Sequence, residues 1–243
     1  MCELFGASAS QARGYSPWLM PFRERGGAAA DNPDGWGIAS WASDQARIEK
    51  SPEPGWRSER FRQLAQSVNS RLLLAHVRKA RHPPLPGLLN THPFAHACCD
   101  REWVFAHNGM VPDLIDQSGP EAICRPEGET DSEFAFCHLL AAIVDAYDDD
   151  LAHWLEQLAT RATAIAALGK FNFLLSDGRV LIAYGHDRLH HAERAGGVAL
   201  IATEALDAGA WQAFAPGELR VYRDGVLLAS HAAVPFRQEN RLP

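Results

Sequence analysis

The chain has 243 residues and a mass of 26.7 kDa, which suits one large domain or at most two small ones. Its formal net charge of −7 argues against nucleic acid or an anionic membrane as the main partner, because either would need a basic face. No apolar run approaches the roughly 18 residues that span a bilayer, and no basic segment followed by an apolar stretch opens the chain, so we expect neither a membrane helix nor a signal peptide.

The first half of the chain predicts strands, short helices and one long loop. The glycines of residues 34–41 suit places where another backbone passes close by. Residues 79–91 are rich in Pro and Gly and form a loop of the length typical of lids. We expect strands at 2–8, 34–41, 46–50, 71–78 and 102–107, a helical turn at 17–22 and a helix at 56–67.

The second half predicts two helices followed by strands. The pairs Asp177-Gly178 and Asp224-Gly225 are signals for hairpin turns. Strands, then helices, then strands predict an α+β domain with two sheets, and the polar tail 236–243 lies beyond them. We expect helices from 130 to about 147 and near 150–167, and strands at 170–176, 179–185, 188–193, 198–203, 218–223 and 226–230.

Five cysteines is an odd number, and their spacing is uneven. Cys98 and Cys99 are adjacent and can hardly bridge to each other. We therefore expect reduced thiols and a cytoplasmic protein.

Cys2 directly follows the initiator methionine, so removal of Met1 would leave a thiol and a free α-amine on the same carbon. The thiolate is the nucleophilic form of cysteine, and an α-amine with a pKa near 7.7–8.0 can accept the thiol proton. The pattern predicts an N-terminal nucleophile that works only once Met1 is gone. The alternative is a small apolar residue at the start of a strand.

Two later segments carry groups that could serve such a nucleophile. Arg78 ends the apolar run 71–78, where a guanidinium could clamp a carboxylate; the alternative is an arginine in a weak surface ion pair. Asn108-Gly109 is either a tight hairpin turn or an oxyanion hole, in which losing one donor costs about 2.7–4 kcal/mol of transition-state stabilisation. The residues alone leave both pairs of alternatives open.

Residues 130–133 match a capping box, with Thr130 at the N-cap and Glu133 three residues on. This pattern explains Thr130 and Glu133. It leaves Asp131 in the first helical turn with a carboxylate free to bind a substrate ammonium.

Taken in chain order, these segments resemble the class II glutamine amidotransferases. The resemblance implies a four-layer αββα sandwich of the N-terminal-nucleophile type with two mainly antiparallel sheets, formed by one glutaminase domain over residues 1–243. It rests on Cys2, Arg25-Gly26, Asp34-Gly35-Trp36-Gly37, His76-Val77-Arg78, His107-Asn108-Gly109, Glu129-Thr130-Asp131, residues 201–204 and 216–219, and Asp224-Gly225.

The resemblance also implies how the reaction runs. Cys2 would attack the γ-amide of glutamine or of a γ-glutamyl compound, with its own α-amine as base and with Asn108 and Gly109 as the oxyanion hole. A γ-glutamyl thioester would form, and ammonia would leave for a partner synthase or for solvent. No cofactor or metal is needed in this scheme.

Substrate recognition would fall to four further residues. Arg78 would hold the α-carboxylate of glutamine and Asp131 its α-ammonium, with Thr130 beside Asp131 in the same motif. His76 either shapes the site or is a buried structural histidine.

The chain departs from the large synthases of this family in two respects. Arg78 is followed by Lys79-Ala80-Arg81 rather than by an aromatic residue and a Thr-His-Gly segment, and no synthase domain is expected after the glutaminase domain. The chain looks more like the small stand-alone group, which includes the γ-glutamyl hydrolase of ergothioneine synthesis.

Three other functions fit parts of the pattern. An N-terminal-nucleophile acylase for other amides would have no use for Arg78 and Asp131 together. A non-catalytic regulatory module could bind an amino acid through the same two residues. A metal site is the third possibility, with candidate ligands His92, His96, His107, Cys98 and Cys99. It is disfavoured because Pro93 lies between His92 and His96 and argues against a helix that would place these two histidines on one face.

Overall fold

The structure, a computed structural model, describes residues 1–42, 45–81, 87–117, 119–120, 123–146 and 151–232. The predicted tail 236–243 and the middle of the predicted lid loop 79–91 lie outside the described residues. Within those ranges, no helix combines the length and the apolar character that crossing a bilayer requires.

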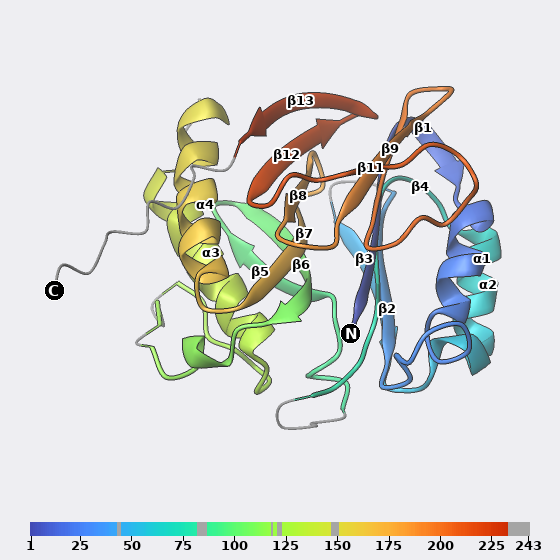
Figure 1. The fold of residues 1–243 in the computed structure, drawn as a ribbon, viewed down its shortest axis with the longest axis horizontal. Helices are drawn as coiled ribbons and strands as arrows, with labels where there is room; N and C mark the ends of the chain where they lie inside the picture. Colours follow the sequence, from blue (N-terminus) through green and yellow to red (C-terminus); the bar gives the residue numbers. More distant parts are fainter. Residues whose placement is uncertain (43–44, 82–86, 118, 121–122, 147–150, 233–243) are drawn as a thin grey trace, which may run out of the picture.

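Two antiparallel sheets form the centre of the molecule (Figure 1). The first has the order β11-β9-β10-β1-β4-β2-β3 and comprises β1 (Glu3–Gly14), β2 (Trp36–Trp41), β3 (Ala46–Ser51), β4 (Asn69–Val77), β9 (His190–Arg194), β10 (Val198–Ala202) and β11 (Gln212–Ala213). The second has the order β13-β12-β8-β7-β6-β5 and comprises β5 (Phe94–Cys98), β6 (Arg101–Met110), β7 (Lys170–Ser176), β8 (Leu181–Gly185), β12 (Glu218–Arg223) and β13 (Val226–His231).

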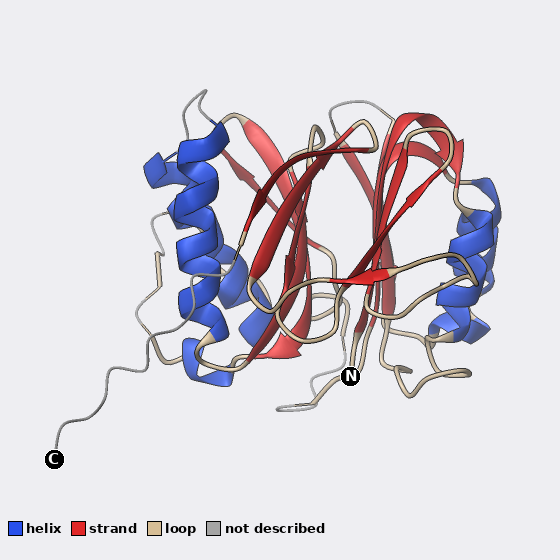
Figure 2. Cartoon of the chain, turned by 45° about the horizontal axis from the view of Figure 1, so that its top comes forward, coloured by secondary structure: helices blue, strands red, loops and turns tan. Residues whose placement is uncertain are grey.

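Helices cover the outer face of each sheet, so the molecule has four layers (Figure 2). The helices α1 (Ser16–Glu24) and α2 (Glu59–Ser67) pack on the first sheet, with the 3-10 turn η1 (Gly55–Arg57) beside them. The helices α3 (Asp131–Ala146) and α4 (Leu151–Ala166) pack on the second, near the 3-10 turn η2 (Pro112–Leu114). The predicted αββα sandwich is confirmed.

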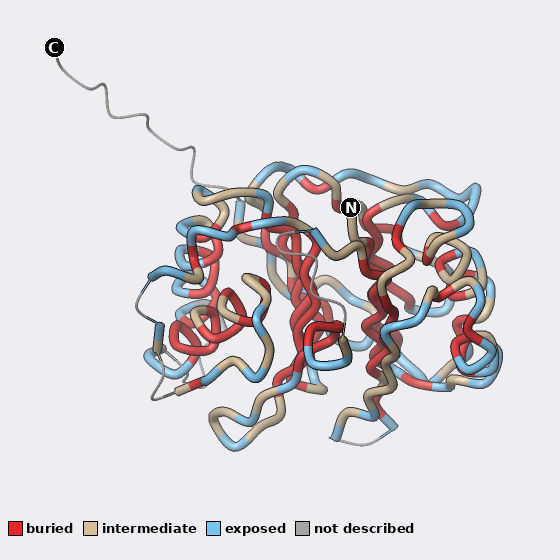
Figure 3. Tube along the Cα trace, turned by 90° about the horizontal axis from the view of Figure 1, so that it is seen from below, coloured by how far each residue is buried: buried red, intermediate tan, exposed pale blue. Residues whose placement is uncertain are grey.

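The alternation of side chains along β1 explains how the layers join. Leu4 faces the second sheet and contributes to the core between the sheets, whereas Phe5 faces α1 and α2. A third cluster, which includes Phe105 and Phe136, fills the space between the second sheet and α3 and α4. Figure 3 shows the buried positions concentrated along the strands, with the amino terminus between the two sheets.

Several predicted elements hold with shifted boundaries. The turn predicted at 17–22 is the full helix α1, and the strand predicted at 2–8 extends to Gly14. Both Asp-Gly turns are confirmed: Asp224 and Gly225 have φ of 51° and 76°, and Gly178 has φ of 83°.

The hairpin interpretation of Asn108-Gly109 is wrong. Strand β6 continues through both residues to Met110, with Asn108 opposite Asn172 and Gly109 opposite Phe171 on β7. The adjacent strand supplies pairing partners along this stretch, and a local turn preference cannot compete with a full ladder.

The expectation of reduced thiols is wrong for two of the five cysteines. Cys124 and Cys137 form a disulfide, with their Cα atoms 5.0 Å apart. Cys124 lies before α3 and Cys137 lies within it, and their separation of 13 residues along the chain gave no sign of this contact. Cys2, Cys98 and Cys99 are free, and the sulfurs of Cys98 and Cys99 lie 3.1 Å apart.

At Gly37 another segment of backbone passes close by, as predicted for the glycines of residues 34–41. A Cβ there would overlap the carbonyl oxygen of His92 and would lie 2.8 Å from Cδ of Pro93. We therefore expect Gly37→Ala to lower the free energy of unfolding by about 1–3 kcal/mol through overpacking, measured by urea denaturation. Gly119→Ala, which has open space around its Cβ position, is the control and should change stability little. Equal stability of both variants would contradict the close packing at Gly37.

Candidate functional site

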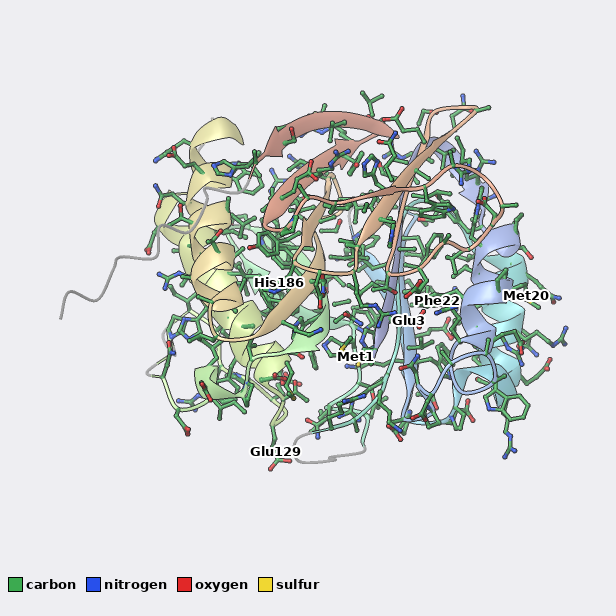
Figure 4. The ribbon with its side chains drawn as sticks, in the orientation of Figure 1. Met1, Glu3, Met20, Phe22, Glu129 and His186 are labelled. Atoms are coloured by element: carbon green, nitrogen blue, oxygen red, sulfur yellow. A yellow bond between two sulfur atoms is a disulfide. The ribbon has the colours of Figure 1, made fainter. Side chains whose placement is uncertain are left out.

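A cavity of about 680 Å³ opens at the end of the sandwich where β1 begins and β4 and β6 end. In Figure 4, Met1 lies between the two sheets, with Glu129 at the lower edge. Five of the seven predicted site residues line the cavity, namely Cys2, Arg78, Gly109, Thr130 and Asp131. The other lining residues are Met1, Lys79, Ala80, Arg81, His92, His107, Met110, Pro112, Glu129, Ser132, Leu168, Gly169 and Lys170.

The thiol of Cys2 is held against the backbone that leaves β4. The Lys79 N–H donates to the Cys2 sulfur at 3.2 Å, and the sulfur lies 3.5 Å from the Lys79 carbonyl oxygen. The next residue, Glu3, is buried and forms a bidentate ion pair with Arg25 from the loop after α1. These contacts from two different loops fix the start of the chain at the cavity.

Burial dominates the electrostatics of the thiol and the terminal amine. It raises the pKa of the Cys2 thiol, while the Lys79 N–H, the Arg78 charge and the terminal ammonium oppose that shift. Burial also lowers the pKa of the Met1 amine, with the Cys2 charge opposing and Arg81 reinforcing the effect. This terminal amine belongs to Met1, whereas the proposed base is the α-amine of Cys2, which is free only after Met1 is removed.

Arg78 follows the last residue of β4 and is only 5% exposed. Its backbone is tied to the segment before β2, because its N–H donates to the Gly35 carbonyl at 2.8 Å and its carbonyl accepts from the Asp34 N–H at 3.0 Å. The Asp34 carboxylate also accepts the Ala80 N–H at 2.8 Å. The surface ion-pair interpretation of Arg78 is therefore wrong: it is a buried cation on the cavity wall.

Asn108 lies behind the cavity wall, and Gly109 lies on it. The side-chain amide of Asn108 donates to the carbonyl oxygen of Cys2, so it contacts the backbone of that residue rather than open space. At Gly109, a Cβ would overlap the Lys170 carbonyl oxygen, so only glycine fits between the strands.

Asp131 is the first residue of α3 and faces the cavity, but its carboxylate is partly engaged. It accepts the Val111 N–H at 2.6 Å. The predicted capping box is half formed, because Thr130 Oγ1 accepts the Glu133 N–H at 3.3 Å. The Glu133 carboxylate instead accepts the N–H groups of Glu127 and Gly128, each at 2.8 Å, and so secures the loop that leads into Asp131.

Three buried histidines form the floor beneath these groups. His76 lies behind the cavity, and its Nε2 contacts the His107 carbonyl oxygen at 3.1 Å. The His92 ring packs against the His76 ring at a tilt of 31°, with ring centroids 4.2 Å apart, and His107 Nδ1 lies 2.8 Å from the Ser132 hydroxyl. His92 and His107 also line the cavity, although neither was predicted as a site residue. The sequence marked both as candidate metal ligands and marked His107 also as the first residue of the His107-Asn108-Gly109 segment.

The described part of the chain contains no group of three or more His, Cys, Asp or Glu side chains placed to hold a metal ion. His96, a member of the proposed set, directs its Nε2 to the Ile123 carbonyl oxygen at 2.9 Å. The geometry therefore gives the metal-site alternative no support.

The comparisons with known proteins agree with this geometry. The family model described as "Glutamine amidotransferases class-II" matches residues 1–197. The chain belongs to the class II glutamine amidotransferases. It is thus an enzyme of the class whose substrates are glutamine and γ-glutamyl compounds, rather than a non-catalytic binding module.

Alignments with related proteins cover most of the length of this amidotransferase. The Escherichia coli (strain K12) protein named "Putative glutamine amidotransferase YafJ" is 33% identical over 252 residues, covering 91% of this chain and 97% of that protein. The "Gamma-glutamyl-hercynylcysteine sulfoxide hydrolase" of Mycobacterium tuberculosis (strain H37Rv) is 31% identical over 185 residues, covering 74% and 71%. A crystal structure of a "predicted glutamine amidotransferase from Pseudomonas aeruginosa PA01" superposes with a TM-score of 0.73 at 30% identity, covering 94% of this chain and all of that one.

Burial makes the stability of this amidotransferase depend on pH through His76. It lowers the pKa of His76 from 6.5 to about 3, so the unfolded state binds more protons between these values and stability falls as pH drops below 6.5. We expect the loss of unfolding free energy between pH 7 and pH 5 to be smaller in His76→Gln by about 2 kcal/mol, measured by urea denaturation at both pH values. An unchanged loss would show that His76 has the same pKa in the folded protein as in the unfolded chain.

Proposed function

We propose that Cys2, freed of Met1, cleaves the γ-amide bond of glutamine or of a γ-glutamyl compound. The α-amine of Cys2 takes the thiol proton, and the thiolate attacks the amide carbonyl to form a tetrahedral oxyanion. Collapse of this intermediate forms a γ-glutamyl thioester and breaks the C–N bond, with the proton passing to the leaving ammonia or amine. Water then hydrolyses the thioester to glutamate and restores the thiol.

The observation that carries this proposal is the placement of three groups around one cavity: the Cys2 thiol, the Arg78 guanidinium and the Asp131 carboxylate. A free amino acid presents an α-carboxylate and an α-ammonium, and Arg78 and Asp131 complement these two charges. Thr130 adjoins Asp131 on the wall, and His76 supports the wall from behind. The side-chain amide of a bound glutamine would then reach toward the thiol.

The oxyanion would be stabilised by Asn108 and Gly109 in this scheme. The Asn108 amide points to Cys2, and one of its two hydrogens suffices for the Cys2 carbonyl. Gly109 brings its backbone to the cavity wall without a side chain in the way. We place both donors at the carbonyl oxygen of the substrate, where charge develops.

The size of the cavity favours a second candidate within the same chemistry. At about 680 Å³ it lies in the range of roughly 300–1,000 Å³ typical of pockets for drug-sized ligands, which exceeds what glutamine alone needs. A γ-glutamyl amide with a larger amine as leaving group would fill it better. The alternative is a separate synthase that receives the ammonia; a panel of glutamine and γ-glutamyl amides, assayed for glutamate release without any partner, distinguishes the two.

We further propose that residues 1–243 act as one domain. Strand β1 from the start of the chain pairs with β10, and β12 and β13 from its end complete the second sheet. Neither sheet is complete without segments from both halves of the sequence.

Cys2→Ala should abolish glutamate release from every member of the panel, because no other described residue lining the cavity carries a thiol. The measurement is coupled detection of glutamate, together with the intact mass of the protein. Active wild-type protein should lack the mass of Met1. Full activity in protein that retains Met1 would rule out the α-amine as base.

Arg78→Lys should lower kcat/KM for glutamine by about tenfold to a hundredfold, because a lysine cannot make the two charge-assisted hydrogen bonds of a guanidinium. The loss should appear mainly in KM, measured from initial rates. Arg71→Lys, an exposed arginine on β4, is the matched control and should retain wild-type kinetics. Similar kinetics in Arg78→Lys and Arg71→Lys would exclude Arg78 from substrate binding.

A further inference from the structure

Asn172 on β7 is completely buried and faces Asn108 across the ladder between β6 and β7. Its Nδ2 donates to the backbone carbonyl of Asn108 at 3.1 Å and lies 3.4 Å from the side-chain oxygen of Asn108. The same Nδ2 donates to the Asp187 carboxylate at 2.8 Å. Its Oδ1 accepts the N–H groups of His186, Asp187 and Arg188 at 2.8, 3.1 and 3.3 Å.

This network determines which way round the Asn108 amide lies. The two ends of a carboxamide have nearly the same shape, so only hydrogen bonding distinguishes them. With the Asn172 NH₂ beside it, the Asn108 side chain must present its oxygen to Asn172, because two donors would otherwise meet. The Asn108 NH₂ is thereby directed to Cys2, as observed.

The oxygen of Asn172 fixes a second structure near the terminal amine. Three consecutive N–H groups converge on it and hold the turn from His186 to Arg188. The Arg188 guanidinium, at the end of that turn, forms an ion pair with Glu204. Burial is the main cause that lowers the pKa of the Met1 amine, and the Arg188 charge adds to it. In the view of Figure 4, His186 lies between Met1 and the helices α3 and α4.

We propose that Asn172 is a positioning residue that holds the Asn108 amide with its N–H groups toward the nucleophile. The proposal rests on the proposed function, because it takes Asn108 as a donor to the oxyanion. Nothing in the sequence marked this position, which lies in the interior of a predicted strand.

Asn172→Asp separates the two halves of the network. A carboxylate keeps the acceptor for the N–H groups of residues 186–188, but it has no hydrogen to donate to Asn108 or Asp187. The Asn108 amide then loses the contact that sets its orientation. We expect kcat for glutamate release to fall by about tenfold to a hundredfold, less than or equal to the loss of a whole oxyanion donor, with KM within about twofold of wild type.

Alkylation of Cys2 by iodoacetamide supplies a readout that does not involve an oxyanion. Its rate reports the thiolate alone and is followed by mass spectrometry of the N-terminal peptide, which separates Cys2 from Cys98 and Cys99. We expect this rate to be unchanged in Asn172→Asp. Asn69→Asp, at an exposed position on β4, is the matched control for the added charge and should match wild type in both assays.

The double variant Asn172→Asp with Asp187→Asn removes the repulsion between two adjacent carboxylates. It restores a donor and an acceptor between positions 172 and 187 but still offers Asn108 no donor. We expect Asn172→Asp to lower the melting temperature and the double variant to regain it, while kcat stays low in both.

Each remaining outcome overturns the proposal in a distinguishable way. Wild-type kcat in Asn172→Asp, or recovery of kcat in the double variant, would show that Asn172 does not act through Asn108. A parallel fall in kcat and alkylation rate would place its effect on the nucleophile. Wild-type protein without Cys2-dependent glutamate release would instead reject the proposed function, and this inference with it.

Discussion

The position of the site depends on strand β1, which pairs with a neighbouring strand along each of its two edges. Strand β1 lies between β4 and β10, with Glu3 opposite Val77 and Phe5 opposite Ala202. The Leu4 N–H donates to the Thr203 hydroxyl, and the Leu4 carbonyl accepts the Thr203 N–H, so the pairing continues past the end of β10. A slip of one residue would exchange the faces of Leu4 and Phe5 and place apolar side chains in the wrong layer. The register therefore determines where Cys2 lies.

The same register brings the charged groups of the site together. Because Val77 pairs with Glu3, Arg78 emerges from β4 beside Cys2, and Lys79 offers its N–H to the sulfur. Arg78 is buried, and a buried cation is costly unless opposite charge or strong hydrogen bonds compensate. The charge of Asp34 acts on Arg78, and in the proposed function a substrate carboxylate would add to that compensation.

The second sheet and its helices supply the other wall. Strand β6 carries Gly109 to the cavity, and β7 supports it through the close contact between Gly109 and Lys170. Helix α3 begins at Asp131, and the loop before it is held by Glu133 and by the amide oxygen of Asn90, which accepts the Glu129 N–H at 2.9 Å. The cavity thus lies between the two sheets, with donors and charges held by backbone contacts on both sides.

Short-range features of the sequence predicted much of this molecule by themselves. The α+β class, the Asp-Gly turns and the close approach at Gly37 followed from local patterns, because turn conformations, strand alternation and residue chemistry act over a few residues. The placement of Cys2 and Arg78 at one site was implied only by the resemblance to the class II glutamine amidotransferases. The tertiary structure decided what those patterns left open: β6 continues through Asn108-Gly109 because β7 lies alongside, Cys124 meets Cys137, and Asn172 orients Asn108. Each of these depends on segments far apart in the chain, whose contacts form only when the two sheets stack.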